Sequence, residues 1–149
     1  MTELVFRPMV MEDVPEVSEI ESDTFSTPWR ETTFQSLLER PGVEMWIAEH
    51  PPRSVAAYAV LWCIHDEAEL ANIAVRPTLQ RRGIGAELLD CVLELALERG
   101  VKSVYLEVRT SNEAAQSLYT SRGFGQVGVR RNYYERPRED AWVLLKRLV

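Results

Sequence analysis

The sequence predicts a single-domain α/β fold in which a mixed sheet carries helices on both faces. The chain has 149 residues, 46% hydrophobic and 27% charged, which fits one ordinary globular domain. In its second half two strand-like segments are followed by a helix, a strand, a helix and two strands. No repeat, low-complexity run or linker interrupts residues 1–149, so we expect one domain.

Two helices and four strands are predicted for the first half. One helix opens at Glu12 and Asp13, with Pro15 tolerated in its first turn, and a second lies between Pro28 and Pro41. Their apolar sides are formed by Val14, Val17, Ile20, Phe34, Leu37 and Leu38. Strands are predicted at 4–7, 43–49, 55–64 and 67–75, with turns at 50–54 and 65–66.

The second half begins with the strongest helical pattern in the chain, over 84–99, closed by Gly100. Its apolar residues recur at the spacing of one buried face: Ile84, Leu88, Leu89, Val92, Leu95 and Ala96. A strand over 101–109 and a helix over 112–122 follow. Closing strands are expected at 124–132 and 140–147.

Charge and composition limit the partners. The net charge of −6 disfavours binding to a nucleic acid backbone, so no direct contact with nucleic acid is expected. The longest apolar run, 55–64, is too short for a membrane helix, and no signal peptide is evident, so we expect no membrane association and a cytoplasmic protein. Cys63 and Cys91 lack metal-ligand spacing and are expected to be buried free thiols; no metal is expected.

The stretch 75–85 is predicted to hold a strand end, a glycine-bearing loop and a helix start. Helix N-termini expose unpaired N–H groups, and Gly83 and Gly85 would let the backbone approach an anion closely. Arg81 and Arg82 add positive charge. The spacing matches neither G-x-G-x-x-G nor a P-loop, which disfavours dinucleotide redox chemistry and mononucleotide hydrolysis. Alternatively, the glycines only shape a turn.

Two motifs flank the predicted strand at 101–109. They are Val75-x-Pro77-x-x-Gln80-x-x-Gly83-Ile84-Gly85-x-x-Leu88-Leu89 and Asn112-x-x-Ala115-x-x-Leu118-Tyr119-x-x-x-Gly123-Phe124. In this order they resemble the motifs of the GNAT (Gcn5-related) N-acetyltransferase superfamily, and the resemblance covers nearly the whole chain. It implies one N-acetyltransferase domain over 1–149, a mixed sheet splayed in the middle, and acetyl-CoA as co-substrate.

The resemblance also assigns a set of cofactor-binding residues. The strand backbone at Ile73, Ala74 and Val75 would pair with the acetyl-pantetheine arm. The pyrophosphate would be held by Arg81, Arg82, Gly83, Ile84, Gly85 and Ala86. Asn112 would contact the pantetheine or the sulfur end; its alternative role is an N-cap, and the two roles are compatible.

Transfer of an acetyl group to an amine needs a base for the amine and an acid for the leaving thiolate. Glu107 is the candidate base, because its apolar neighbours predict burial and a raised pKa. The alternative is a strand carboxylate that pairs with Arg109 at i+2. Tyr119 is the candidate acid. Glu107 on the strand and Tyr119 on the helix each lie roughly 10 Å from the turn between these elements, so an antiparallel arrangement would bring the two side chains to the same height. Alternatively, Tyr119 is a helix core residue. The family motif favours the acid.

A closer resemblance is to the bacterial ribosomal-protein-alanine N-acetyltransferases, which acetylate the N-terminal amine of a small-subunit ribosomal protein. The matching segments are Phe25-x-x-Pro28-Trp29, 66–75, 106–112, 131–134 and 139–141, whereas 50–58 lacks the glycines common there. The resemblance implies a protein N-terminus as acceptor, with Glu107 as base and Tyr119 as acid.

Five residues are candidates for binding that acceptor: Trp29, Glu67, Glu69, Tyr133 and Tyr134. The two glutamates would attract a cationic peptide terminus, and the tyrosines would wall its groove. The alternatives are a solvated hairpin and ordinary packing aromatics. Acetylation of a small amine, and a non-catalytic acyl-CoA-binding module, remain competing functions; a transfer-RNA acceptor is disfavoured by the charge.

Overall fold

The computed structural model describes residues 3–50 and 54–149. Within these residues the chain forms seven strands, four α-helices and two short 3-10 helices: β1 (Val5–Pro8), η1 (Met11–Asp13), α1 (Val14–Thr24), α2 (Glu31–Leu38), β2 (Val43–His50), β3 (Ser54–Ile64), β4 (Glu67–Val75), η2 (Pro77–Leu79), α3 (Ile84–Glu98), β5 (Ser103–Arg109), α4 (Glu113–Ser121), β6 (Gly125–Tyr134) and β7 (Glu139–Arg147).

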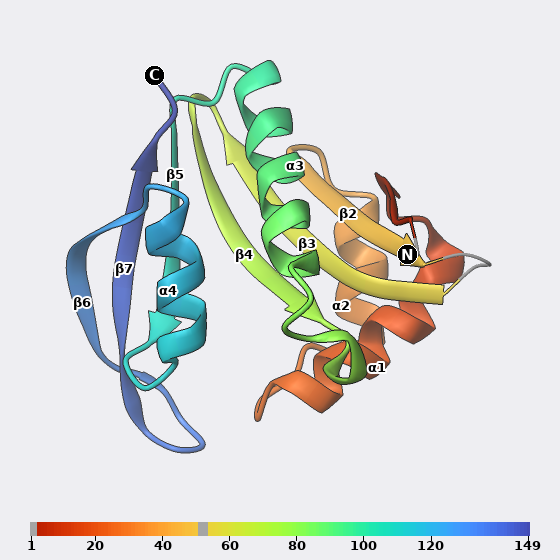
Figure 1. Cartoon of the computed structure of the whole chain (residues 1–149), viewed down its shortest axis with the longest axis horizontal. Helices are drawn as coiled ribbons and strands as arrows, with labels where there is room; N and C mark the ends of the chain where they lie inside the picture. The colour runs from red at the N-terminus through yellow and green to blue at the C-terminus, as the bar shows by residue number, and fades with distance from the viewer. Residues whose placement is uncertain (1–2, 51–53) are drawn as a thin grey trace.

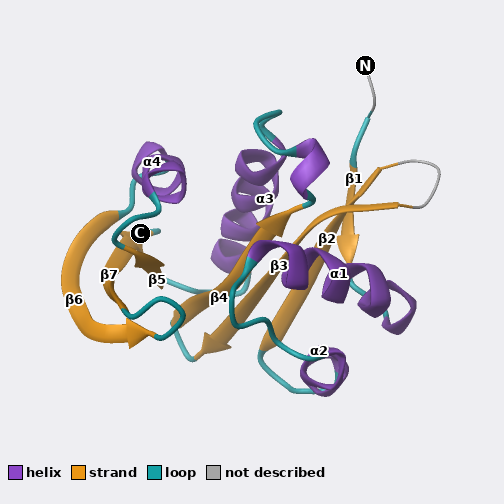
Figure 2. Ribbon diagram, turned by 90° about the horizontal axis from the view of Figure 1, so that it is seen from below, coloured by secondary structure: helices purple, strands orange, loops and turns teal. Residues whose placement is uncertain are grey.

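The strands form one sheet in the order β1-β2-β3-β4-β5-β7-β6. The pair β4–β5 is parallel and the other neighbouring pairs are antiparallel. Helices α3 and α4 cover one face, and α1 and α2 cover the other (Figure 1, Figure 2). The predicted mixed sheet with helices on both faces is therefore confirmed.

Each face of the sheet has its own hydrophobic core. The core under α3 and α4 contains the fully buried pair Leu88 and Leu89, which the helical periodicity predicted. The core under α1 and α2 is built on Val17, Ile20 and Phe34. Successive side chains of a strand point to opposite faces of the sheet. In β5 the side chains on the face covered by α4 are buried, whereas those on the opposite face are partly exposed.

The parallel pair β4–β5 is joined only at one end. Three residue pairs are in register, and the last is Glu69↔Tyr105. Beyond it β4 continues to Val75 and β5 to Arg109, and the two strands diverge (Figure 1). We call this region, 70–75 and 106–109, the fork. The splayed sheet that the resemblance implied is thus confirmed.

A β-bulge shapes the β4 side of the fork. Val60 of β3 lies opposite Asn72, whereas Leu61 lies opposite Leu70, so Ala71 is an extra residue on β4. Bulges bend a strand and redirect its side chains, and they are frequent beside functional sites. Here Ala71 packs against the α1–α2 core, and Asn72 donates a hydrogen bond to the same side. No feature of the sequence predicted this bulge.

Several boundaries differ from those predicted, for local reasons. Strand β5 begins at Ser103 and not at 101, because the turn that ends α3 includes residues 100–102: Gly100 has φ +84, and the Val101 N–H donates to Ala96 O at 3.0 Å. A 3-10 turn precedes α1. Residues 51–53 of the predicted turn lie outside the described residues.

Cys63 and Cys91 are free, but both are half-buried and not buried as expected; partial burial raises the pKa of each thiol. Across residues 3–50 and 54–149, no helix is long and apolar enough to cross a membrane.

Candidate active site

Two carboxyl groups meet where the fork opens. Glu69 closes the last β4–β5 pair, and Glu107 lies two residues beyond its partner Tyr105, on the same face of the sheet. Their carboxyl groups lie close together on that face, since the Glu107 carboxyl raises the pKa of Glu69. Glu107 is well shielded, with 8% of its side chain exposed, and Arg130 Nε lies 3.4 Å from its Oε1. The predicted burial of the candidate base is therefore seen.

Within this pair, the pKa of Glu69 is raised. Burial raises the pKa of Glu69, the nearby carboxylate of Glu107 raises it further, and Arg130 lowers it. Glu69 therefore keeps its proton to a higher pH than an exposed glutamate does. Glu67, at the start of β4, is exposed and lies at the closed end of the strand pair. Of the two acidic residues predicted for the acceptor, Glu69 is the one beside Glu107.

The alternative partner for Glu107 is not formed. Arg109 turns to Glu139 of β7, with Nη1 to Oε1 at 3.1 Å, and its guanidinium stacks 4.3 Å from the centre of the Tyr134 ring. Glu107 is left with Arg130 and Glu69. The carboxyl group thus remains beside the fork.

Tyr119 lies on α4, which covers the face of the sheet opposite to Glu107. It is 7% exposed, packs edge-on against Phe124 at 5.7 Å between ring centres, and belongs to the α3–α4 core. Burial raises the pKa of its hydroxyl, and Tyr134 raises it further. The pKa of Tyr134, about 12, is itself raised by burial and then by Tyr133 and Glu107. Tyr134 is thus within electrostatic reach of both Glu107 and Tyr119.

Tyr133 and Tyr134, the two aromatic residues predicted to line the acceptor groove, lie on β6. Tyr133 and Tyr134 pack edge-on, with 5.0 Å between ring centres. Tyr133 is 45% exposed and lies under the Arg130 guanidinium, 5.5 Å away, whereas Tyr134 is half-buried. Burial raises the pKa of Tyr133, and Glu107 and Glu69 add to it. These rings therefore flank the carboxyl pair.

The predicted phosphate loop leads from β4 into α3. Arg81 and Gly83 both adopt left-handed backbone, with φ +66 and φ +80, and Gly83 is the residue before the first turn of α3. Such alternating conformations turn successive N–H groups to one side, which suits an anion. The Gln80 side chain donates to Val75 O at 3.2 Å and ties the loop to the strand end. Arg81 and Arg82 are exposed.

The remaining residues predicted for the cofactor line the fork or the helix start. Beyond Glu69, the edge of β4 that faces β5 has no strand partner among the described residues, and Ile73, Ala74 and Val75 lie on it. A Cβ on Gly85 would lie 3.3 Å from Val75 Cγ2, so glycine lets α3 approach this strand. Ile84 is buried in the α3 core, and Ala86 is partly exposed.

Asn112 is the N-cap of α4. Its Oδ1 accepts a hydrogen bond from the Ala115 N–H at 3.1 Å, which is the alternative role that the sequence suggested. The side chain is exposed, so the cap leaves its amide group accessible.

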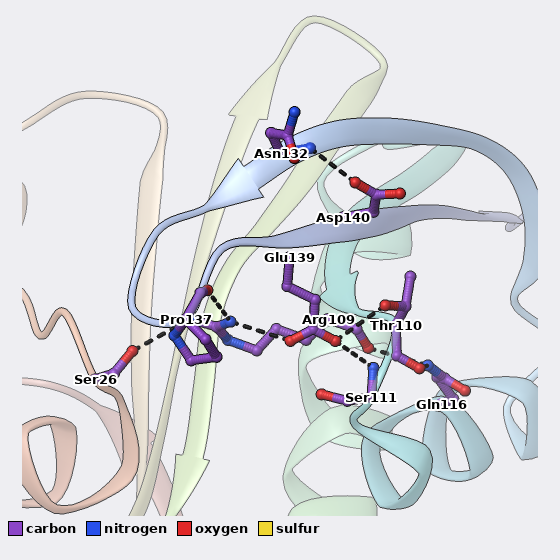
Figure 3. A network of polar contacts seen from close by, with 9 residues as sticks. All are labelled: Ser26, Arg109, Thr110, Ser111, Gln116, Asn132, Pro137, Glu139 and Asp140. Carbon is purple, nitrogen blue, oxygen red and sulfur yellow. Dashed lines mark hydrogen bonds and ion pairs between the residues drawn. The ribbon is translucent and has the colours of Figure 1, made fainter.

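A network of polar contacts surrounds Arg109 and Glu139 (Figure 3). Arg109, at the end of β5, donates to Ser26 Oγ at 3.2 Å and to Pro137 O at 3.0 Å. Glu139 accepts from Thr110 Oγ1 at 2.9 Å and from Ser111 N at 2.6 Å. These bonds connect the α1–α2 loop, the β5–α4 turn and the β6–β7 hairpin. Hydrogen bonds from Ser111 and its neighbours hold the pKa of Glu139 at about 2.

Sequence reasoning missed a buried carboxyl group in α1. Glu21 is 1% exposed and accepts hydrogen bonds from Trp29 N at 2.9 Å, Asn72 Nδ2 at 2.6 Å and the Tyr58 hydroxyl. A signal existed: Glu21 is four residues after Val17, on the apolar stripe of the helix. The Trp29 ring is half-buried and packs on Phe34, with 5.5 Å between ring centres.

No group of three or more His, Cys, Asp or Glu side chains suited to a metal ion is found within residues 3–50 and 54–149. The candidate site is therefore built from carboxyl, phenol and guanidinium groups around the fork, next to a helix N-terminus.

Comparison with known proteins gives the family to which this forked sheet and the glycine-bearing start of α3 belong. The model of the acetyltransferase (GNAT) family matches residues 14–124. The chain belongs to this family and is an acetyltransferase.

Its relatives narrow the group. The chain is 40% identical over 134 residues to the ribosomal protein bS18-alanine N-acetyltransferase of Escherichia coli, covering 89% of each protein. It is 35% identical over 135 residues to the enzyme of that name from Haemophilus influenzae, covering 89% of this chain and 90% of the relative.

Solved structures agree. The crystal structure of the ribosomal-protein-S18-alanine N-acetyltransferase from Escherichia coli has a TM-score of 0.91 at 36% identity, covering 98% of this chain and 94% of that one. Ard1 from Thermoplasma volcanium has a TM-score of 0.90 at 26% identity, covering 98% of each chain.

Proposed function

We propose that this enzyme transfers the acetyl group of acetyl-CoA to the N-terminal α-amine of a protein, and that its acceptor is the N-terminal alanine of a small-subunit ribosomal protein. The observation that carries the proposal is the Glu69–Glu107 pair at the opening of the fork, where an amine and a donor bound along β4 would meet. The acceptor is supported by the relatives, which are known as ribosomal-protein-alanine N-acetyltransferases.

The donor would lie along the unpaired edge of β4. Backbone groups of Ile73 to Val75 are free of a strand partner on that side and suit the amides of a pantetheine arm. The pyrophosphate would be bound at the start of α3, where the left-handed turns at Arg81 and Gly83 and the helix dipole favour an anion. Asn112 would contact the pantetheine or its sulfur end while it caps α4.

Proton transfer would proceed through Glu107 and Tyr119. An α-amine with a pKa of about 8 is mostly protonated at neutral pH. Glu107 would take that proton, directly or through water, and the amine lone pair would attack the thioester carbonyl carbon. A strand N–H near Val75 would stabilise the oxyanion of the tetrahedral intermediate.

Collapse of that intermediate breaks the C–S bond. Tyr119, a phenol that is protonated at neutral pH, would give its proton to the CoA thiolate. The nitrogen, still carrying an extra proton, would return one to the Tyr119 phenolate, and Glu107 would release its proton to solvent. The sum is an amide, CoA thiol and one proton, with no covalent acyl-enzyme.

The acceptor would approach between the α1–α2 loop and β6. Trp29 lies in that loop, and Tyr133 and Tyr134 lie on β6 beside the carboxyl pair. The negative charge of Glu69, with Glu67 further out, would attract the cationic terminus. These residues are the ones we assign to acceptor binding.

The test compares acceptors with the purified chain and acetyl-CoA. An alanine-initial peptide, the same peptide with a blocked α-amine, and a polyamine are supplied at equal concentration, and CoA release is measured. The proposal predicts turnover with the free peptide alone. Faster turnover with the polyamine would assign a small-amine substrate, and acetyl-CoA binding without turnover on any amine would assign a non-catalytic module.

A further inference from the structure

Glu21 is a buried carboxyl group to which the proposed reaction gives no task. Its three hydrogen-bond donors, the Trp29 N–H, the Asn72 amide and the Tyr58 hydroxyl, are all uncharged. Burial raises its pKa, and the hydrogen bonds act in the opposite direction. A carboxylate buried without a cation is costly compared with an apolar side chain of similar size. Its place in the α1 core therefore needs a reason other than stability.

The donors lie on segments that border the fork from two sides. Trp29 belongs to the loop 25–30 between α1 and α2, whose Ser26 contacts Arg109 at the end of β5. Asn72 directly follows the bulge residue Ala71 on β4. One carboxylate thus joins the loop assigned to the acceptor to the strand assigned to the acetyl donor.

The third donor differs from the other two. Tyr58 lies in β3, is fully buried, and packs edge-on against Phe34 with 5.7 Å between ring centres. Its bond to Glu21 joins α1 to β3, which pairs with β4 at Ala74, and it contacts neither loop 25–30 nor the bulged residues of β4. The chain therefore offers two side-chain bonds to the same carboxylate, of which only the Asn72 bond connects to the bulged segment of β4.

We propose that Glu21 is a positioning residue, which holds loop 25–30 against the bulged segment of β4 so that acceptor amine and thioester meet at the fork. The inference rests on the proposed function, because it assumes that this loop and this strand carry the two substrates. Glu21 itself touches neither substrate and acts through Trp29 and Asn72.

Its loss would act mainly on kcat and on the acceptor KM. A displacement of about 1 Å between reacting groups can cost up to roughly a hundredfold in rate. Acetyl-CoA affinity would change little, because the proposed pyrophosphate site at the start of α3 does not involve this network. A merely structural role would instead lower activity in step with thermal stability, whichever bond is cut.

The experiment cuts the two side-chain bonds separately. Asn72→Ala removes the link to β4, and Tyr58→Phe removes the link to β3 as a matched control; Glu21→Gln weakens both while keeping the side-chain size. For each variant kcat and KM are measured with an alanine-initial peptide and acetyl-CoA, the Kd of acetyl-CoA by calorimetry, and Tm by calorimetric unfolding. The double variant Glu21→Gln with Asn72→Ala completes a cycle.

Asn72→Ala and Glu21→Gln should lower kcat by about tenfold or more, with acetyl-CoA Kd within about threefold, and the double variant should be no slower than the slower single one. Tyr58→Phe should lower Tm but leave kcat within about threefold. Equal loss of kcat in Tyr58→Phe and Asn72→Ala, unchanged kcat in Asn72→Ala, or additive losses would overturn the inference. A wild-type chain that does not acetylate the peptide would instead refute the proposed function.

Discussion

The carboxyl groups of Glu69 and Glu107 lie close together on one face of the sheet, at the point where β4 and β5 part. The parallel register ends at Glu69, and the alternation of β5 puts Glu107 on the same face two residues later. A single geometric feature, the fork, thus places two neighbouring carboxyl groups at the entrance to the unpaired edge of β4.

Replacement of Glu107 by glutamine tests the base. We expect Glu107→Gln to lower kcat by about a hundredfold, since general base catalysis contributes on the order of 10²–10⁴-fold. The Kd of acetyl-CoA should stay near the wild-type value, because the buried side of β5 faces the α3–α4 core and Glu107 lies on the other side of the strand. Steady-state kinetics with calorimetric binding measure both, and an unchanged kcat would remove Glu107 from this role.

Replacement of Glu69 by glutamine tests the raised pKa. The folded-state pKa of Glu69 lies above that of the unfolded chain, about 4.3, so folding favours the protonated form. Its stabilising contribution is present below the unfolded pKa and is lost as pH rises through the folded pKa. Glu69→Gln should therefore raise Tm at pH 7 relative to wild type, and this gain should vanish near pH 4.

The control for that experiment is Glu67→Gln, an exposed position on the same strand. Calorimetric scans from pH 4 to 8 should show little change of Tm for it at any pH. A Tm difference for Glu69→Gln that stays constant across the range would contradict the account of the pair.

The candidate acid is tested by Tyr119→Phe. Phenylalanine keeps the edge-on packing against Phe124, so the fold should be retained, while kcat should drop by about tenfold or more. Tyr58→Phe, which also removes a buried hydroxyl, serves as the control and should keep its kcat. If the two phenylalanine variants turn over equally well, Tyr119 is only a core residue.

Two arginines test the pyrophosphate site. Arg81→Ala and Arg82→Ala should each raise the Kd of acetyl-CoA several-fold, by an amount of about 1 kcal/mol that shrinks at high salt. Arg99→Ala, at the other end of α3, is the matched control and should leave the Kd unchanged. Equal effects at both ends of the helix would argue against a site at its N-terminus.

Two glycines test the fold itself. Gly42 and Gly100 have nearly the same left-handed φ, +85 and +84, but a Cβ on Gly42 would lie 2.8 Å from Cys63 O, whereas one on Gly100 meets no atom within 4 Å. Gly100→Ala should cost about 1 kcal/mol of unfolding free energy. Gly42→Ala should cost clearly more, measured by urea unfolding; equal costs would contradict the packing at this turn.

Periodicity and turn residues predicted much of the fold. The apolar stripe of α3 and the apolar run of β3 are local patterns, so these elements lie where expected. The bulge at Ala71 could not be predicted, because it depends on the register between two strands and not on either sequence alone. The fork came from the family resemblance, since no local pattern marks where a parallel pair ends.

The site was predicted in part. Motif spacing indicated Glu107, Tyr119 and the loop at Arg81, but not their neighbours, because a close approach such as that of Glu69 to Glu107 depends on how strands pair. The alternative pairing of Glu107 with Arg109 was based on their spacing of two residues along one strand. It is not formed because Arg109 pairs with Glu139 of β7. Their assignment to catalysis and to cofactor binding stays a prediction until the variants are measured.

The central claim is that the chain acetylates a protein N-terminal alanine. It is tested most directly by N-terminal proteomics on cells with and without this protein, together with a strain restored by the Glu107→Gln variant. The account predicts that one or a few alanine N-termini, including that of a small-subunit ribosomal protein, lose acetylation without the protein and do not regain it with the variant. Unchanged acetylation of all protein N-termini would contradict it.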